Sequence, residues 1–161
     1  MDQPGTGVPA TDAELDAARD AQGPLSVAVA GRLLNRARAR LDAGDLREAL
    51  ADYQRVVGND DLELTAAAWL GTGDALYRLD AEPQALNAWQ AVVKLPESRS
   101  TYGAWRRIAG ARVRSGDLGA AFDAYREADR RAPAEDKAEI ASRLGWLSKE
   151  QGQGGAARRY F

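Results

Sequence analysis

The sequence repeats itself at a spacing of 36 residues. Five columns align across four rows, and each column largely keeps one kind of side chain. Self-similarity of this length is typical of solenoids, in which each repeat buries its apolar face against its neighbours. The repeat therefore restricts the fold more than any single motif does. The columns are Leu33, Trp69, Trp105 and Ala141; Ala37, Gly73, Ala109 and Gly145; Gly44, Asp80, Gly116 and Gly152; Ala49, Ala85, Ala121 and Ala157; and Tyr53, Trp89, Tyr125 and Phe161.

Each row predicts a helical hairpin. Before the turn column, apolar and small residues recur at spacings of three and four, as in Trp105, Ile108 and Ala109, which is helical periodicity. The turn reads Gly-Asp at 44–45 and 116–117, where Gly suits the residue after a helix and Asp suits the N-cap of the next. The sequence therefore predicts an all-α fold, with helices near 26–43, 45–57, 62–79, 81–95, 100–115, 117–132, 134–150 and from 154 onward.

The small residues predict how closely the helices of a hairpin approach. Helices pack with their axes about 8–10 Å apart, the distance depending on the side chains at the contact. We expect Gly73 to lie against Ala85, and Ala109 against Ala121, with Trp and Tyr side chains filling the space around these contacts.

The first 24 residues are predicted to be an acidic leader outside the repeats. Residues 1–25 hold five acids and one base, and residues 1–10 are expected to be disordered. Thr11 and Glu14 have capping-box spacing, which predicts a short helix that ends before Gly23-Pro24. The repeat domain is then expected at residues 25–161, divided at 26–61, 62–97, 98–133 and 134–161, with the last repeat truncated.

The amino-acid composition excludes most kinds of catalytic site. The chain has no Cys and no His, so the usual general base and the commonest zinc ligands are missing. We therefore expect no catalytic site, no metal site, no cofactor and no enzyme activity. Gly71-Thr72-Gly73 fits a dinucleotide loop poorly, because it lies inside a predicted helix and no strand precedes it.

Charge and hydropathy restrict the expected location of the chain and the kinds of partner that it binds. A net charge of −2 gives no reason to expect nucleic-acid binding. The sequence has no apolar run of membrane-spanning length, so we expect no membrane insertion within this chain and a cytoplasmic location. One alternative stays open, a membrane-surface or RNA role for the cluster Arg32, Arg36, Arg38 and Arg40.

The rows resemble the tetratricopeptide repeat. The resemblance covers about residues 26–161 and implies a right-handed α-α superhelix of four helical hairpins. The period of 36 differs from the usual 34 of that family, and Ala141 replaces an aromatic residue in the fourth row. The third row matches most fully, with Trp105, Ile108-Ala109, Gly116-Asp117, Ala121, Tyr125, Ala128 and Pro133.

The resemblance implies a concave groove that binds a peptide or a partner protein, lined by the first helix of each hairpin. Its mixed basic and apolar surface would suit an acidic segment with apolar anchors, because Arg binds carboxylates through two parallel hydrogen bonds. In the alternative interpretation, these arginines are a solvated helix face and Trp146 packs on the next helix. The expected groove residues are Leu34, Arg38, Leu70, Tyr77, Arg78, Arg106, Val113, Arg114, Trp146 and Lys149, and the same columns contain Leu41, Asp74 and Ser142.

Two further hypotheses concern the C-terminal end. Tyr160-Phe161 leaves two aromatic residues where the last predicted helix stops, so we expect the protein to continue or to associate with itself through this end. The last repeat and the GRLLNRARARL segment also resemble the soluble leader of bacterial proteins in which repeats precede a rhomboid-type intramembrane protease. That resemblance implies a cytoplasmic regulatory domain of a larger membrane protein, with the catalytic Ser and His beyond residue 161.

Overall fold

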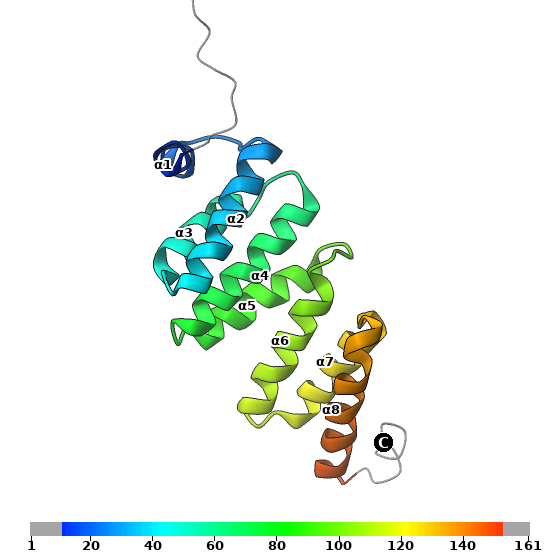
Figure 1. The fold of residues 1–161 in the computed structure, drawn as a ribbon. Helices are drawn as coiled ribbons and strands as arrows, with labels where there is room; N and C mark the ends of the chain where they lie inside the picture. The colour runs from blue at the N-terminus through cyan, green and yellow to red at the C-terminus, as the bar shows by residue number, and fades with distance from the viewer. Residues whose placement is uncertain (1–10, 153–161) are drawn as a thin grey trace, which may run out of the picture.

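The computed structural model describes residues 11–152, which form helices stacked in sequential hairpins (Figure 1). The predicted all-α fold of helical hairpins is confirmed. Figure 1 shows α1 at one end of an elongated stack and α8 at the other. Within the described range no helix is long and apolar enough to cross a bilayer. The helices are α1 (Asp12–Asp20), α2 (Val27–Ala43), α3 (Leu46–Val56), α4 (Leu62–Arg78), α5 (Glu82–Lys94), α6 (Thr101–Arg114), α7 (Leu118–Arg131), the 3-10 helix η1 (Ala134–Asp136) and α8 (Lys137–Glu150).

The predicted helices between residues 26 and 150 all exist, and most of their ends lie within a residue or two of the expected ones. The predicted short helix is α1, and its capping box is present, because the Thr11 amide donates to Glu14 Oε2 at 2.9 Å. The helix expected from 154 onward and the disorder expected for residues 1–10 lie outside the described residues. The division of the chain at residue 25 stays a prediction.

The four residues of the turn column all adopt the left-handed backbone conformation. Gly44, Gly116 and Gly152 have φ angles of 91°, 77° and 72°, and Asp80 adopts the same region at φ 59°. In the first three turns the following residue donates its amide to a carbonyl five residues earlier, as Asp117 does to Arg112 at 3.0 Å. This pattern ends one helix and satisfies its last carbonyls. Asp80 is therefore the one turn residue of the described repeats that carries a Cβ in this conformation.

Capping by the Asp after the turn is confirmed only in part. The Asp117 side chain accepts from the Ala120 amide at 3.1 Å, so it caps α7. Asp45 lies at the N-cap of α3, but its side chain makes no capping hydrogen bond.

Two glycines let α4 lie between aromatic rings. A Cβ built on Gly71 would come within 2.3 Å of the Tyr53 ring of α3, and one on Gly73 within 2.3 Å of the Trp89 ring of α5. The nearest atoms to Gly73 thus belong to Trp89, where the sequence suggested Ala85. The absence of two methyl groups therefore admits a ring on each side of α4 and brings α3, α4 and α5 together.

The core forms two neighbouring clusters. The first contains α1, α2 and α3 side chains together with Ala68 of α4, and the second continues from α4 to α8. Tyr53, Trp89 and Tyr125 of the second helices are buried, whereas Trp69 and Trp105 of the first helices are partly buried at the edge of the second cluster. The second-helix aromatic column therefore supplies the largest buried rings.

We expect Gly73→Ala to destabilise the protein. Its methyl group would overlap the Trp89 ring, and overpacking of this kind costs about 1–3 kcal/mol, more than the gain of about 1 kcal/mol in helix propensity. Gly31→Ala in α2 is the control, because nothing lies within 4 Å of its added Cβ and only the propensity gain remains. Urea unfolding followed by circular dichroism measures both. Equal stability of the two variants would contradict the ring-on-glycine packing.

Asp80→Gly should raise the free energy of unfolding by about 0.5–1 kcal/mol, because glycine adopts the left-handed region without the Cβ clash. The reciprocal change Gly116→Asp should lower the free energy of unfolding by a similar amount. Urea midpoints at an unchanged slope provide the measurement. A lower midpoint for Asp80→Gly would show that the Asp80 side chain stabilises this turn.

Candidate partner-binding groove

A hollow lies between α4 and α6. Its volume is about 510 Å³. Most of its walls come from the first helices of two successive hairpins, and Leu41 of α2 and Trp89 of α5 complete them. The lining residues are Leu41, Asp74, Tyr77, Arg78, Trp89, Arg106, Arg107, Gly110 and Arg114.

Asp74 is fully engaged inside this hollow. Its carboxylate accepts two hydrogen bonds from Arg107, at 2.5 Å from Nε and 2.7 Å from Nη2. It also accepts a bond of 3.1 Å from the indole Nε1 of the buried Trp89. One carboxylate therefore connects α4, α5 and α6, and its charge is balanced by Arg107 rather than offered to a ligand.

Tyr77 lies between an aromatic ring and a cation. Its ring centroid is 5.8 Å from that of Trp89, and the guanidinium carbon of Arg114 lies 4.4 Å from the Tyr77 centroid. A guanidinium at this distance is attracted to the face of the ring. Arg114 is thereby held over the hollow while it stays exposed.

Two of the hollow's arginines have no carboxylate partner among the described residues. Arg78 donates from Nη1 to the Leu41 carbonyl of α2, at 2.5 Å, and Arg114 is held by Tyr77. Arg106 differs, because it lies 3.4 Å from Asp136 Oδ2 and 3.6 Å from Glu139 Oε2. The positive charge open to a ligand is therefore that of Arg78 and Arg114.

Arg106 lines the hollow, and its guanidinium carbon lies 5.8 Å from the ring centroid of Tyr102. Burial raises the pKa of Tyr102 to about 12, and its hydroxyl also donates to Asp136 at 2.7 Å. Burial alone would lower the pKa of Arg106, but Tyr102, Glu139 and Asp136 raise it above its ordinary value. Both groups therefore keep their protons throughout the physiological pH range.

Two smaller hollows extend this surface toward α2. One of about 270 Å³ shares Leu41, Asp74 and Arg107 with the first and adds Arg38 and Leu70. Another of about 340 Å³ shares Arg38 with the second and reaches Leu34. We call these three adjoining hollows the groove.

The structure brings seven of the ten predicted groove residues to the groove. Tyr77, Arg78, Arg106 and Arg114 line the largest hollow. Leu34 lines the groove but is only 4% exposed, so it acts mainly as a core residue. The other two, Arg38 and Leu70, line the middle hollow.

Three predicted residues do not line any of these hollows. Val113 is partly buried in α6, and Trp146 and Lys149 are exposed on α8. Trp146, with 42% of its surface accessible, is one of two large exposed apolar side chains of the described residues. The described structure neither gives it a partner nor joins it to the groove.

Sequence reasoning missed Arg107, which lies next to a predicted column and not in it. The sequence did contain one indication of it. Asp74 is an acid among predicted groove positions whose charged residues are otherwise basic, and a carboxylate there would need a cation beside it. The spacing of 33 residues between the two is not a repeat spacing, so the pattern alone could not identify Arg107 as that cation.

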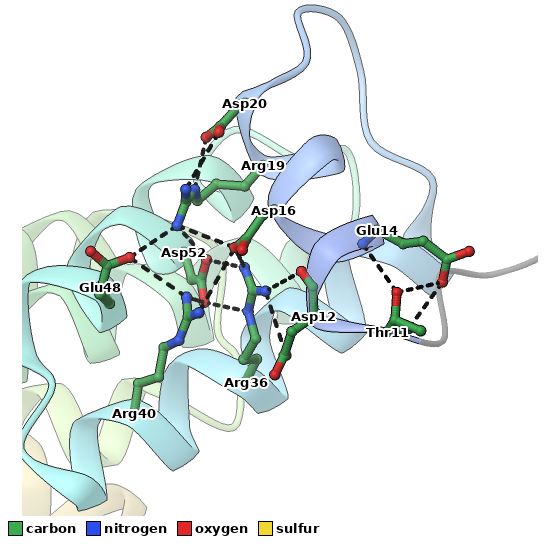
Figure 2. Close-up of polar contacts among 10 residues, drawn as sticks. All are labelled: Thr11, Asp12, Glu14, Asp16, Arg19, Asp20, Arg36, Arg40, Glu48 and Asp52. Carbon is green, nitrogen blue, oxygen red and sulfur yellow. Dashed lines mark hydrogen bonds and ion pairs between the residues drawn. The ribbon is translucent and has the colours of Figure 1, made fainter.

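Half of the basic cluster of α2 forms ion pairs within the protein. Figure 2 shows Arg36 and Arg40 pointing at Asp52 of α3, and the shortest distances are 2.8 and 2.7 Å. Asp16 of α1 lies 2.9 Å from Arg36. Two of the four arginines considered for RNA or a membrane surface are therefore already paired with carboxylates.

Comparisons with known proteins agree with this fold. The structure described as "Crystal structure of MamA" is 20% identical to this chain, with a TM-score of 0.66, and the match covers 82% of this chain and 74% of that one. It is one of 23 solved chains that match, and at this identity the likeness concerns the fold alone. No curated protein matches the sequence.

The family comparison is more specific than the structural one. The family described as "Tetratricopeptide repeat" matches residues 34–93 and 83–136, more than half of the chain. Domains of this family are generally protein–protein interaction modules and are typically non-catalytic. The helical hairpins, their turn column and this match together show that the chain belongs to the tetratricopeptide repeat family.

Proposed function

We propose that this chain is a non-catalytic module that binds an acidic protein segment with apolar anchors in the groove. The observation that carries the proposal is the pair Arg78 and Arg114, two guanidiniums at one hollow without a carboxylate partner in the described residues. Guanidinium groups bind carboxylates through charge-assisted hydrogen bonds. An acidic side chain of a partner would therefore supply the carboxylate that Arg78 and Arg114 lack in the described structure.

The apolar part of the proposal is supported by the residues beside these arginines. Leu41 and Tyr77 line the same hollow, and Leu70 lines the next one. Each is partly exposed, so a bound side chain could cover its remaining surface. A few apolar contacts beside oriented charges are typical of peptide recognition. Trp146, Lys149 and Val113 stay candidates for a longer segment that continues along the array.

The partner's preference for acids can be tested by selecting random linear peptides displayed on phage. We expect the selected peptides to combine Asp or Glu with Leu or an aromatic residue. Fluorescence anisotropy of a labelled selected peptide should then show that Arg114→Glu weakens binding about tenfold or more, which is about 1.4 kcal/mol. Arg47→Glu on α3 is the charge-matched control, because Arg47 is exposed and does not line the groove. Selected peptides without acids, or equal binding by both variants, would contradict the proposal.

Asp74→Asn should have the opposite effect on the same peptide. Asparagine can still accept from Trp89 through its amide oxygen, but it releases the Arg107 guanidinium to the ligand. One added free charge at a partly exposed site is worth about 0.5–1 kcal/mol, so affinity should rise several-fold. Unchanged or weaker binding by Asp74→Asn would show that the acids of the peptide lie away from this hollow.

A further inference from the structure

Helix α1 falls in the sequence register of a second helix from a preceding repeat. Moving α3 (Leu46–Val56) back by the period of 36 gives residues 10–20, and α1 covers 12–20 of that window. Ala13 then aligns with Ala49, and Asp16 aligns with Asp52. The packing differs from that of a repeat helix, because α1 contacts both α2 and α3 and its contact with α2 is much smaller than that of α3 with α4. Helix α1 therefore keeps the repeat register in sequence but is only loosely packed on the first hairpin.

The surface beneath α1 is built by α2 and α3 alone. Asp52 has no exposed surface, and its carboxylate accepts two bonds of 2.8 Å from Arg36 and one of 2.7 Å from Arg40. Both arginines belong to α2, so this pairing does not depend on α1. Glu48 of α3 lies 3.9 Å from Arg40 at the exposed side of this pairing, so two carboxylates of α3 face the two guanidiniums of α2.

Helix α1 adds carboxylates and one further arginine to this cluster (Figure 2). Arg19 of α1 lies 3.1 Å from Glu48 Oε2 and 3.9 Å from Asp52 Oδ1. Asp16 lies 2.9 Å from Arg36 and 3.8 Å from Arg40, and the Asp12 carbonyl accepts from Arg36 at 3.0 Å. Leu15 is 5% exposed and belongs to the first core cluster. Asp12, Leu15 and Asp16 share one helix face, because residues at spacings of three and four are neighbours on a helix.

Helix α1 is held to the α2 and α3 surface by one buried apolar side chain and by ion pairs. The helix has nine residues and buries one large apolar side chain, Leu15. Helices shorter than about 12–15 residues are marginal in water, so α1 depends on its docking for order. Its carboxylates remain partly exposed, at 81% for Asp12 and 43% for Asp16, and salt screens such pairs.

The segment after α1 is attached independently. Arg55 of α3 donates to the carbonyls of Ala21 and Gly23, at 3.1 and 2.6 Å, and Asn59 donates to that of Leu25 at 2.9 Å. Gly23 has a φ of 109° at this point. Helix α1 can therefore leave its site while the connection to α2 stays in place.

We propose that the surface of α2 and α3 beneath α1, centred on Arg36, Arg40 and Asp52, is a second recognition site. Its ligand is an amphipathic helix of a partner protein, with carboxylates at positions i and i+4 for Arg36 and Arg40, a leucine at i+3 and an arginine at i+7 for Glu48. Helix α1 occupies the site in cis until such a helix displaces it. The site shares no arginine with the groove, so this inference and the proposed function can be tested independently of each other.

The test uses a fluorescein-labelled peptide of residues 11–22 and the full chain. In one variant, Leu15→Ser together with Asp16→Asn releases α1. The peptide should bind this variant about tenfold more tightly than the wild type, which corresponds to α1 filling the site in about nine molecules of ten. A peptide carrying Asp12→Asn and Asp16→Asn should not bind. No binding to the released variant, or equal binding of the neutral peptide, would overturn the proposal.

A groove variant separates the two sites. Adding Arg114→Glu to the released chain should leave the affinity for the α1 peptide unchanged, and loss of binding would place the peptide in the groove and overturn the inference. Hydrogen exchange of the wild type tests the attachment without any substitution. Raising NaCl from about 0.1 M to about 1 M shortens the Debye length from about 10 Å to about 3 Å, so α1 amides should exchange faster while α3 amides stay protected. Salt-independent protection of α1 would overturn an ionic, displaceable attachment.

Discussion

The contact between an aromatic ring and a glycine is the constraint on which the described array depends. Tyr53 lies on Gly71 and Trp89 lies on Gly73, so opposite faces of α4 receive a ring from the previous hairpin and a ring from its own. The second contact also shapes the groove. The same Trp89 donates to Asp74 and lies beside Tyr77, which in turn holds Arg114. One indole ring therefore takes part both in the packing of the hairpin and, through Tyr77, in the placement of Arg114.

The first hairpin differs from the others, because no complete repeat of the described residues packs against its outer side. Arg36 and Asp52 hold the positions that are Ile108 and Ala124 in the third row, where both side chains are buried. A hydrogen-bonded ion pair replaces the apolar contact at this end. Solenoids require terminal units with a polar outer face, and an apolar end would invite further copies to stack. The charged pair and α1 therefore give this side of the first hairpin a polar surface with a defined structure.

The sequence pattern predicted the backbone better than it predicted the polar contacts. Periodicity reports which face of a helix is buried and where the chain must turn, so the helices and the left-handed column at Gly44 and Gly116 followed from it. It does not report which polar groups pair. The bonds from Arg107 to Asp74, and from Arg36 to Asp52, depend on the side-chain geometry of neighbouring helices and on no repeat spacing. Column transfer likewise placed Trp146 in the groove, although no hollow described here includes it.

The two surfaces proposed to bind carboxylates of a partner use arginine in different ways, and this difference should set what each accepts. In the groove, Arg78 and Arg114 are exposed and free of carboxylates, so they favour acidic segments in many conformations and respond strongly to salt. Beneath α1, Arg36 has only 8% of its side chain exposed and is fixed by two bonds to Asp52. A fixed guanidinium accepts a carboxylate in few orientations. Helical register should therefore matter at the α1 surface, whereas charge and apolar content should matter in the groove.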